Sequence, residues 1–277
     1  MKTIEKKIPV SVGILTKDSG KTLLRALLSV ENCAEIILCD GGSTDDTLSI
    51  AREFGCVVIQ QDPQFLDTEK KINNYSGVRN QLLSLSTYDW FLYIDSDEAI
   101  SPELAEEISS ISQNSTPPSL VINVPVRTVL DGKIIKYSSN YPGYQNRLFN
   151  KKSGAYFIKK IHEKITYDKN IYTSHTISSP WYVFGAKDRT RSYLANTLQY
   201  INMEVEMGKN QSWKDYFVYT VWGNLLKSIK IFIKATLMYL RHGFRDSMPV
   251  SIEWGRMVYP LVVMYKFSLH RFKNLFS

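Results

Sequence analysis

Short apolar runs alternate with amphipathic segments along the N-terminal part of the chain. Four of these runs are rich in β-branched and aromatic residues, which favours buried strands: Val10–Leu15, Glu35–Cys39, Val57–Gln60 and Trp90–Ile94. Each is too short for a helix of ordinary length and ends in polar residues. They therefore predict the strands of a sheet.

The segments between these runs follow a helical period. In Lys21–Val30 the leucines gather on one predicted helical face: Leu23, Leu24, Leu27 and Leu28. The other predicted helices run from Thr44 or Asp45, as N-cap, to about Phe54; over Gly77–Leu85; and from Ser101, with Pro102 in the first turn. Strands and helices that alternate at this spacing predict an α/β fold with a mostly parallel sheet flanked by helices.

The second half of the chain changes pattern. After a loop at Gln113–Ser119, the segments Leu120–Val129 and Gly132–Tyr137 are expected to pair as antiparallel strands. From about Thr190 the pattern is helical to the end. We therefore expect a catalytic domain over residues 1–190, with halves at 1–110 and 111–190, and a helical extension over residues 191–277.

The composition predicts a globular protein that neither depends on disulfides nor spans a membrane. Hydrophobic residues make up 44% and charged residues 22% of the 277, which is typical of a globular chain able to fold without disulfides. The three cysteines form no CxxC pair, so we expect buried thiols and a reducing compartment. The N-terminus lacks the apolar stretch of a signal peptide, and no apolar window is long enough to cross a bilayer.

The positive charge is concentrated at the C-terminus. Residues 211–277 contain six Lys and four Arg against three acidic residues, so this segment carries the whole net charge of +7. Trp222–Leu240 places its apolar residues on one broad face, with Lys227, Lys230 and Lys234 opposite or at its edges. This pattern predicts attachment to a membrane surface; the alternative is a helical pair packed on the catalytic domain. No known nucleic-acid-binding motif is present.

Polar clusters follow three of the predicted strands. They are Thr16-Lys17-Asp18, Asp40-Gly41-Gly42-Ser43 and Asp95-Ser96-Asp97. Ligands of open parallel sheets bind beyond the carboxyl ends of the strands. Two carboxylates around a small residue suit Mg²⁺ or Mn²⁺ on a diphosphate. An acidic turn at Asp95–Asp97 and an ordinary Asx turn at Asp40 are the structural alternatives.

A competing motif begins after the first strand. Ser19-Gly20-Lys21-Thr22 resembles a phosphate-binding P-loop, and Phe91–Asp95 resembles the strand that would hold its magnesium. The P-loop needs a glycine five positions before Gly20, where this chain has Leu15. The loop is therefore the wrong size to surround phosphates.

Residues 8–108 resemble the donor-binding half of family 2 glycosyltransferases with the GT-A fold. The matching stretches are VSVGILTKDSGKTLLRALLSV, EIILCDGGSTDDTLSIAREFG, GVRNQLL and DWFLYIDSDEAISPEL. The resemblance implies that Thr16 and Asp40 contact the nucleobase, usually uracil. It makes Asp95 and Asp97 the metal motif, with Asp97 the more direct ligand. Further residues are expected at the donor: Asp18, Arg79, Asn80 and Ser96. Family members often have Asn-Glu where this chain has Asp18-Ser19.

A second stretch, YPGYQNRLFNKKSGAYFIKKIHEKI, resembles the acceptor side of bacterial lipopolysaccharide-core and surface-glycan transferases. An inverting transferase needs a general base, and Glu163 is the candidate. His162 is the candidate for a further metal ligand or a diphosphate contact, with His175 as a rival ligand. Arg147 is expected to pair with the diphosphate. The alternatives are that His162-Glu163 packs a strand end and that Arg147 forms a surface ion pair.

Together these features predict a metal-dependent, inverting glycosyltransferase. It would use Mn²⁺ or Mg²⁺ to move a sugar from a UDP-sugar to a lipid-linked or surface-glycan acceptor. It would work at the cytoplasmic face of the inner membrane and bind no nucleic acid. The alternatives are a P-loop-like ATP-dependent enzyme and a non-catalytic protein that binds sugar nucleotides at a membrane.

Overall fold

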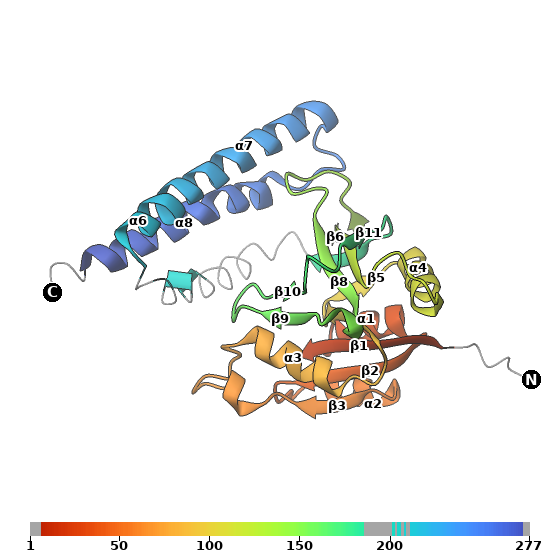
Figure 1. The fold of residues 1–277 in the computed structure, drawn as a ribbon. Coiled ribbons are helices and arrows are strands. Elements are labelled where there is room, and N and C mark those ends of the chain that lie inside the picture. Colours follow the sequence, from red (N-terminus) through yellow and green to blue (C-terminus); the bar gives the residue numbers. More distant parts are fainter. Residues whose placement is uncertain (1–6, 186–200, 203, 206–207, 209–210, 274–277) are drawn as a thin grey trace, which may run out of the picture. The chain divides into compact units, whose positions relative to one another are not determined.

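The computed structural model describes residues 7–185, 201–202, 204–205, 208 and 211–273 (Figure 1). The chain divides into two compact units. Unit 1 comprises Met1–Arg127 with Pro142–Phe184, and unit 2 comprises Thr128–Tyr141 with Gly185–Ser277. The predicted domain boundary at residue 190 lies outside the described residues and stays a prediction.

Unit 1 is built on a mixed sheet with a parallel core. Four neighbouring strands are parallel, in the order β3 (Val57–Gln60), β2 (Cys33–Asp40), β1 (Ile8–Thr16) and β4 (Trp90–Asp95). The antiparallel continuation is formed by β8 (Tyr144–Asn150), β6 (Val121–Leu130), β12 (Trp181–Gly185) and β5 (Glu98–Ile100). β11 (Ser174–Thr176) pairs with β6, while β9 (Tyr156–Ile158) and β10 (Lys164–Thr166) form a separate antiparallel pair.

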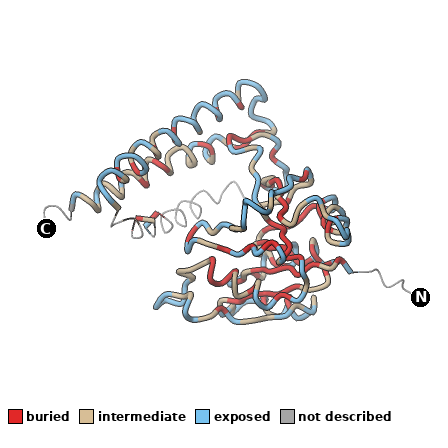
Figure 2. Tube along the Cα trace, in the orientation of Figure 1, coloured by how far each residue is buried: buried red, intermediate tan, exposed pale blue. Residues whose placement is uncertain are grey.

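Helices flank this sheet on both faces. They are α1 (Leu23–Val30), α2 (Thr47–Glu53), α3 (Tyr75–Leu85) and α4 (Pro102–Gln113), with short 3₁₀ turns η1 (Pro63–Phe65) and η2 (Lys151–Ser153). Because side chains alternate along a strand, β4 contributes residues to two hydrophobic cores, one on each face of the sheet. Leu92 and Ile94 pack with α1 and α4, whereas Phe91 and Tyr93 pack with α3. Figure 2 shows the buried residues concentrated along these strands.

The predicted α/β class, the mostly parallel sheet and the C-terminal helices are confirmed. So is the capping of α4, where the Ser101 hydroxyl accepts a hydrogen bond from the Leu104 amide and Pro102 opens the helix. The predicted cap of α2 is wrong: the helix follows Asp46, and the Asp45 carboxylate accepts hydrogen bonds from the amides of Gly20 and Thr47 instead.

The face of α1 is only partly as predicted. Leu23 and Leu27 are buried, but Leu24 and Leu28 are about half exposed, at 49% and 50%. Ala26 and Val30 complete the buried side instead. The helix therefore packs through a narrower stripe than its leucines suggest.

The cysteines carry free thiols. Cys33 and Cys39 are buried, as predicted, whereas Cys56 is only half-buried. Burial raises the pKa of Cys33 and of Cys39 to about 12 and that of Cys56 to about 11. All three thiols are therefore protonated, and so weakly nucleophilic, at neutral pH.

Unit 2 contains a β-turn segment and helices. The end of β6 pairs with β7 (Lys133–Ile134) in antiparallel register about the turn at Asp131-Gly132, which confirms that predicted hairpin. The helices are α6 (Trp213–Asp215), the π-helical η4 (Tyr216–Trp222), α7 (Gly223–His242) and α8 (Val250–Lys273), which continues through Pro260. None of the helices in the described part of the chain has the length and apolarity that crossing a membrane requires.

Candidate active site

The polar clusters predicted at the strand ends are neighbours in the sheet. In the ladder between β1 and β2, Thr16 lies opposite Asp40, and in the ladder between β1 and β4, Leu15 lies opposite Asp95. The loops that follow these strands are also tied together. The Asp18 amide donates to the Ser43 hydroxyl at 2.8 Å, and the hydroxyls of Ser19 and Ser96 are 2.8 Å apart.

Asp40 is fully buried and its carboxylate is satisfied within its own loop. Oδ2 accepts hydrogen bonds from the amides of Gly42 and Ser43 at 2.9 and 2.8 Å. Oδ1 accepts from the hydroxyls of Ser43 and Thr16 at 2.5 and 3.1 Å. This is the Asx turn considered above, and it fixes the shape of the loop after β2. The nucleobase contacts of Thr16 and Asp40 stay predictions.

The loop after β1 lacks the free amides of a P-loop. The Gly20 amide donates to Asp45 Oδ2 at 2.8 Å, and the Ser19 amide donates to the Thr47 hydroxyl at 2.7 Å. Asp18 has a positive φ of 47° and accepts from the Thr44 amide at 2.8 Å. Amides that bind side chains cannot also surround a phosphate, so this geometry disfavours the ATP-binding alternative.

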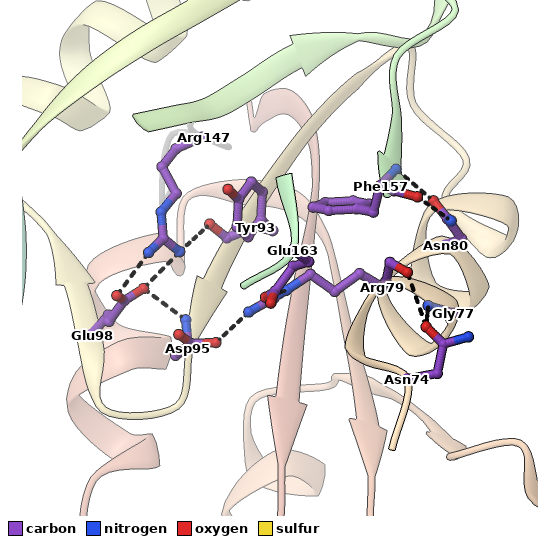
Figure 3. Close-up of polar contacts among 11 residues, drawn as sticks. Asn74, Gly77, Arg79, Asn80, Tyr93, Asp95, Glu98, Arg147, Phe157 and Glu163 are labelled. Atoms are coloured by element: carbon purple, nitrogen blue, oxygen red, sulfur yellow. Dashed lines mark hydrogen bonds and ion pairs between the residues drawn. The ribbon is translucent and has the colours of Figure 1, made fainter. Parts of the chain in front are cut away.

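An arginine joins the predicted metal motif to the predicted base (Figure 3). Arg79, on α3, donates from Nη2 to Asp95 Oδ1 at 2.6 Å and from Nε to Glu163 Oε1 at 2.7 Å. The Arg79 side chain is 4% exposed, Glu163 17% and Asp95 42%. Within the described structure, Arg79 Nη1 is buried without a hydrogen bond. The two carboxylates therefore hold the guanidinium of Arg79 in place, and its Nη1 nitrogen makes no hydrogen bond within the described structure.

Electrostatic interactions keep Arg79 and Asp95 charged. Burial by itself raises the pKa of Asp95, but the positive charges of Arg79 and Arg147 outweigh burial and hold it below its ordinary value. Burial lowers the pKa of the Arg79 guanidinium, and Asp95 and Glu163 reverse that effect and raise it. The Arg79–Asp95 pair is therefore ionised throughout the neutral range.

Arg147 forms a second, fully buried ion pair. It contacts Glu98 through Nη1 at 2.8 Å and Nη2 at 2.9 Å, and both residues are about 5% exposed. The alternative of a surface ion pair is thus wrong. Glu98 also accepts from the Asp95 amide at 2.9 Å and from Trp181 Nε1 at 3.3 Å. Glu98 therefore positions the backbone of the metal motif.

Sequence reasoning missed this role of Glu98, although it directly follows Asp97 in the quoted IDSDE run. Its burial depends on the short strand β5, which pairs with the distant β12. The three residues of β5 are too few to show a periodic pattern.

A cavity of about 790 Å³ opens beside these groups in unit 1. Its lining includes Arg79, Tyr93, Asp95, Arg147, His162 and Glu163. The rest of its wall consists of Asn123, Tyr144, Gln145, Asn146, Lys164, Ile165, Tyr167, Lys169 and Ser174. The structure thus brings the predicted base, Glu163, and two of the three predicted metal ligands, Asp95 and His162, to one cavity.

Other predicted site residues lie differently. Asn80 exchanges two hydrogen bonds of 2.9 Å with the backbone of Phe157 and so fixes β9 on α3. His162 is exposed at the cavity with a positive φ of 51°. Asp97 is half-buried in the turn between β4 and β5. His175 is exposed on β11.

Among the described residues, no three His, Cys, Asp or Glu side chains are grouped to hold a metal ion. The chemistry of the donor set still fits a divalent cation. Asp95 Oδ2 has no partner within the described structure, and its side chain is partly exposed. Mg²⁺ and similar hard cations are commonly held by one or two carboxylates together with substrate phosphates and water. Asp95 and Asp97 would be the carboxylates of such a site.

Comparison with known proteins identifies the family. The model of glycosyl transferase family 2 matches residues 11–170, more than half of the chain. The chain belongs to glycosyltransferase family 2. The predicted family is thereby confirmed, whereas the similarity to lipopolysaccharide-core and surface-glycan enzymes stays a prediction.

Several similar curated proteins are named as glycosyltransferases. An uncharacterized glycosyltransferase of Rickettsia felis is 39% identical over 103 residues, which is 37% of this chain and 33% of that protein. The SPbeta prophage-derived glycosyltransferase SunS of Bacillus subtilis is 25% identical over 215 residues, 75% of this chain and 48% of that one. This chain thus matches between a third and a half of the length of these relatives.

A solved structure is similar at low identity. S. aureus TarS 1-349 in complex with UDP aligns with 96% of this chain and 90% of its own, with 13% identity and a TM-score of 0.47. At this level the likeness assigns no activity or residue role to the chain described here.

Proposed function

We propose that this chain is a metal-dependent, inverting glycosyltransferase that uses a nucleotide-diphosphate sugar, most simply a UDP-sugar. One observation carries the proposal. Arg79 holds the metal-motif carboxylate of Asp95 at 2.6 Å and the carboxylate of Glu163 at 2.7 Å beside one cavity. Inverting transfer requires these two functions side by side: neutralisation of a leaving diphosphate and removal of a proton from the acceptor.

Asp95 and Asp97 are the residues that would hold the cation, with His162 as a candidate third ligand. A bound Mn²⁺ or Mg²⁺ would supply positive charge to the diphosphate oxygens. The chain contributes its own positive charge through Arg79, whose buried Nη1 has no hydrogen bond within the described structure. Arg147 supports this region indirectly, because it fixes Glu98 and through it the backbone of Asp95.

Glu163 would act as the general base. It would take the proton from the acceptor hydroxyl as that oxygen bonds to the anomeric carbon and the nucleotide diphosphate leaves. The Arg79 hydrogen bond orients one carboxylate oxygen and leaves the other for the acceptor. In this role Arg79 is a positioning residue that keeps base and metal motif at a fixed separation.

The acceptor would be a sugar of a lipid-linked or surface glycan. The cavity is also lined by side chains suited to sugar hydroxyls: Asn123, Gln145, Asn146, Tyr144 and Tyr167. Access to such an acceptor would be gained at the cytoplasmic face of a membrane, through the basic C-terminal helices. The sequence excess of positive charge in residues 211–277 supports this placement.

The activity is tested by release of UDP from a panel of UDP-sugars, with and without Mn²⁺. The wild-type chain is expected to release UDP only with the metal, and Asp97→Ala is expected to lower the rate at least about a hundredfold, because it removes charge stabilisation of the leaving group. Asp89→Asn is the matched control, since Asp89 is an exposed carboxylate paired with Lys152 in the same unit. Equal rates for wild type and Asp97→Ala would remove the metal role. Tight UDP binding without release on any donor or acceptor would favour the non-catalytic alternative.

A further inference from the structure

Helix α7 does not pack through its most apolar side. Its buried residues are Asn224, Ser228, Ala235 and Met238. Ser228 donates a hydrogen bond to the Met257 carbonyl of α8 at 2.8 Å. A helix in a soluble protein ordinarily buries its large apolar side chains, so this arrangement is inverted.

Six large apolar side chains of α7, together with Trp222 at the end of η4, are exposed instead. They form what we call the apolar stripe, and each is between 45% and 78% exposed: Trp222, Leu226, Ile229, Phe232, Ile233, Leu237 and Leu240. Their intervals of 4, 3, 3, 1, 4 and 3 residues place them on one broad side of the helix. Figure 2 shows α7 exposed along most of its length.

Four cations lie beside this stripe. Lys227, Lys230, Lys234 and Arg241, here called the basic stripe, follow one another at intervals of three, four and seven residues and are all exposed. None of them forms an ion pair with a described residue. The surface of α7 therefore has three sides: one packed on α8, one apolar and one positively charged.

Helix α8 adds a second exposed apolar row. Val250, Trp254, Tyr265, Leu269 and Phe272 are each between 42% and 61% exposed. The intervals of 4, 11, 4 and 3 residues keep them on one side of the helix. α7 and α8 lie side by side in Figure 1 and form a helical hairpin joined by residues 243–249.

We propose that this helical hairpin lies flat in the surface of an anionic lipid bilayer. The apolar stripe enters the acyl boundary, and the basic stripe meets the phosphates of the headgroups. This inference rests on the proposed function for one point, which is that the acceptor is bound to a membrane. Attachment itself is a property of these two helices and needs no sugar donor.

Charge decides between a lipid surface and other occupants. A second copy of this hairpin would bring together two segments of charge +7, which is unfavourable. A nucleic acid would neutralise the cations but would leave the apolar stripe in water. An anionic bilayer would remove the apolar stripe from water and would also neutralise the basic stripe. No helix among the described residues is able to cross such a bilayer.

The test is flotation of the full chain with vesicles of phosphatidylcholine alone or mixed with phosphatidylglycerol, without donor. We expect binding to the mixed vesicles that weakens with salt. Phe232→Gln with Leu240→Gln should lower the affinity at least about tenfold, because it removes two buried apolar side chains. Lys227→Gln, Lys230→Gln and Lys234→Gln together should lower it on the order of a hundredfold, at about fivefold per lysine.

The matched control replaces two half-exposed leucines of unit 1, Leu24→Gln with Leu28→Gln, and should bind as the wild type does. Circular dichroism checks that each variant is folded. UDP release measured without vesicles should be unchanged in the hairpin variants, so failure of attachment and failure of the transferase proposal are distinguishable. Vesicle binding equal in all variants, or no binding to anionic vesicles, would overturn the inference. A dimer that the Phe232 and Leu240 changes dissociate, without lipid binding, would assign the face to a second copy and overturn it as well.

Discussion

Replacing Glu163 by glutamine is expected to lower the rate of UDP release by about 10²- to 10⁴-fold, the usual contribution of a general base. Glutamine keeps the shape of the side chain and an oxygen that can accept the hydrogen bond of Arg79 Nε, which lies 2.7 Å from the carboxylate in the wild type. The change therefore removes basicity while it leaves Arg79 and Asp95 in place. The KM for the donor should change by less than about threefold, because uniform donor binding is retained.

Steady-state UDP release with saturating Mn²⁺ and water or a sugar acceptor measures this effect. Asp168→Asn is the matched control, since Asp168 is an exposed carboxylate five positions further along the same segment. A Glu163→Gln rate within about twofold of the wild type would assign the proton transfer to another group. A parallel loss in the Asp168 variant would indicate a general effect of the segment rather than of the base.

Replacing Arg147 by methionine is expected to destabilise the fold by about 3–5 kcal/mol, because it leaves the charge of Glu98 buried without its partner. Both residues are about 5% exposed, and the pair is bidentate at 2.8 and 2.9 Å. Methionine keeps much of the volume between Tyr93 and Trp181, whose rings face the guanidinium at 4.6 and 4.4 Å. The loss should therefore come from the uncompensated charge rather than from a cavity.

Urea unfolding followed by circular dichroism measures the free energy of unfolding. The double variant Glu98→Gln with Arg147→Met should be more stable than Arg147→Met alone, because glutamine removes the buried charge. Lys152→Met is the control: it breaks the exposed pair with Asp89 at 3.0 Å and should cost about 0–1 kcal/mol. If Arg147→Met lowered the free energy of unfolding no more than Lys152→Met does, an uncompensated Glu98 charge would not be a large source of instability.

The sheet could be predicted from sequence because its signal is local. The runs that became β1, β2, β3 and β4 are mostly apolar, as strands of a parallel sheet covered by helices usually are, although β3 at the edge of the sheet is partly exposed. Polar residues follow each run. Parallel strands end at one edge, so it could also be predicted that the strand ends with Thr16, Asp40 and Asp95 are neighbours. Family membership followed from the same motifs and was confirmed by comparison.

The partners of the charged groups could not be predicted in this way. Arg79 and Glu163 are 84 residues apart, and their contact depends on how β9 packs on α3. Arg147 and Glu98 meet only because β5 joins the far edge of the sheet. Ion pairs of this kind follow from three-dimensional packing and leave no spacing in the sequence.

The buried face of a helix also could not be predicted fully from the sequence. The sequence predicts that α7 is amphipathic, but not which side packs, since that depends on the surface of α8. The buried side proves to be the one with Asn224 and Ser228, and the apolar stripe is left exposed. In α1, likewise, two leucines of the predicted face are half exposed because Ala26 and Val30 fit closer to the sheet.

The central claim is that Asp95 and Asp97 would hold a divalent cation for a nucleotide diphosphate bound beside Arg79 and Glu163. Calorimetric titration of UDP into the full chain, with Mn²⁺ and again with EDTA, tests it most directly. Binding should require Mn²⁺ and should weaken at least about tenfold in both Asp95→Asn and Asp97→Asn, while Asp89→Asn should match the wild type. UDP binding that is equally tight in EDTA, or unchanged in both aspartate variants, would contradict the account.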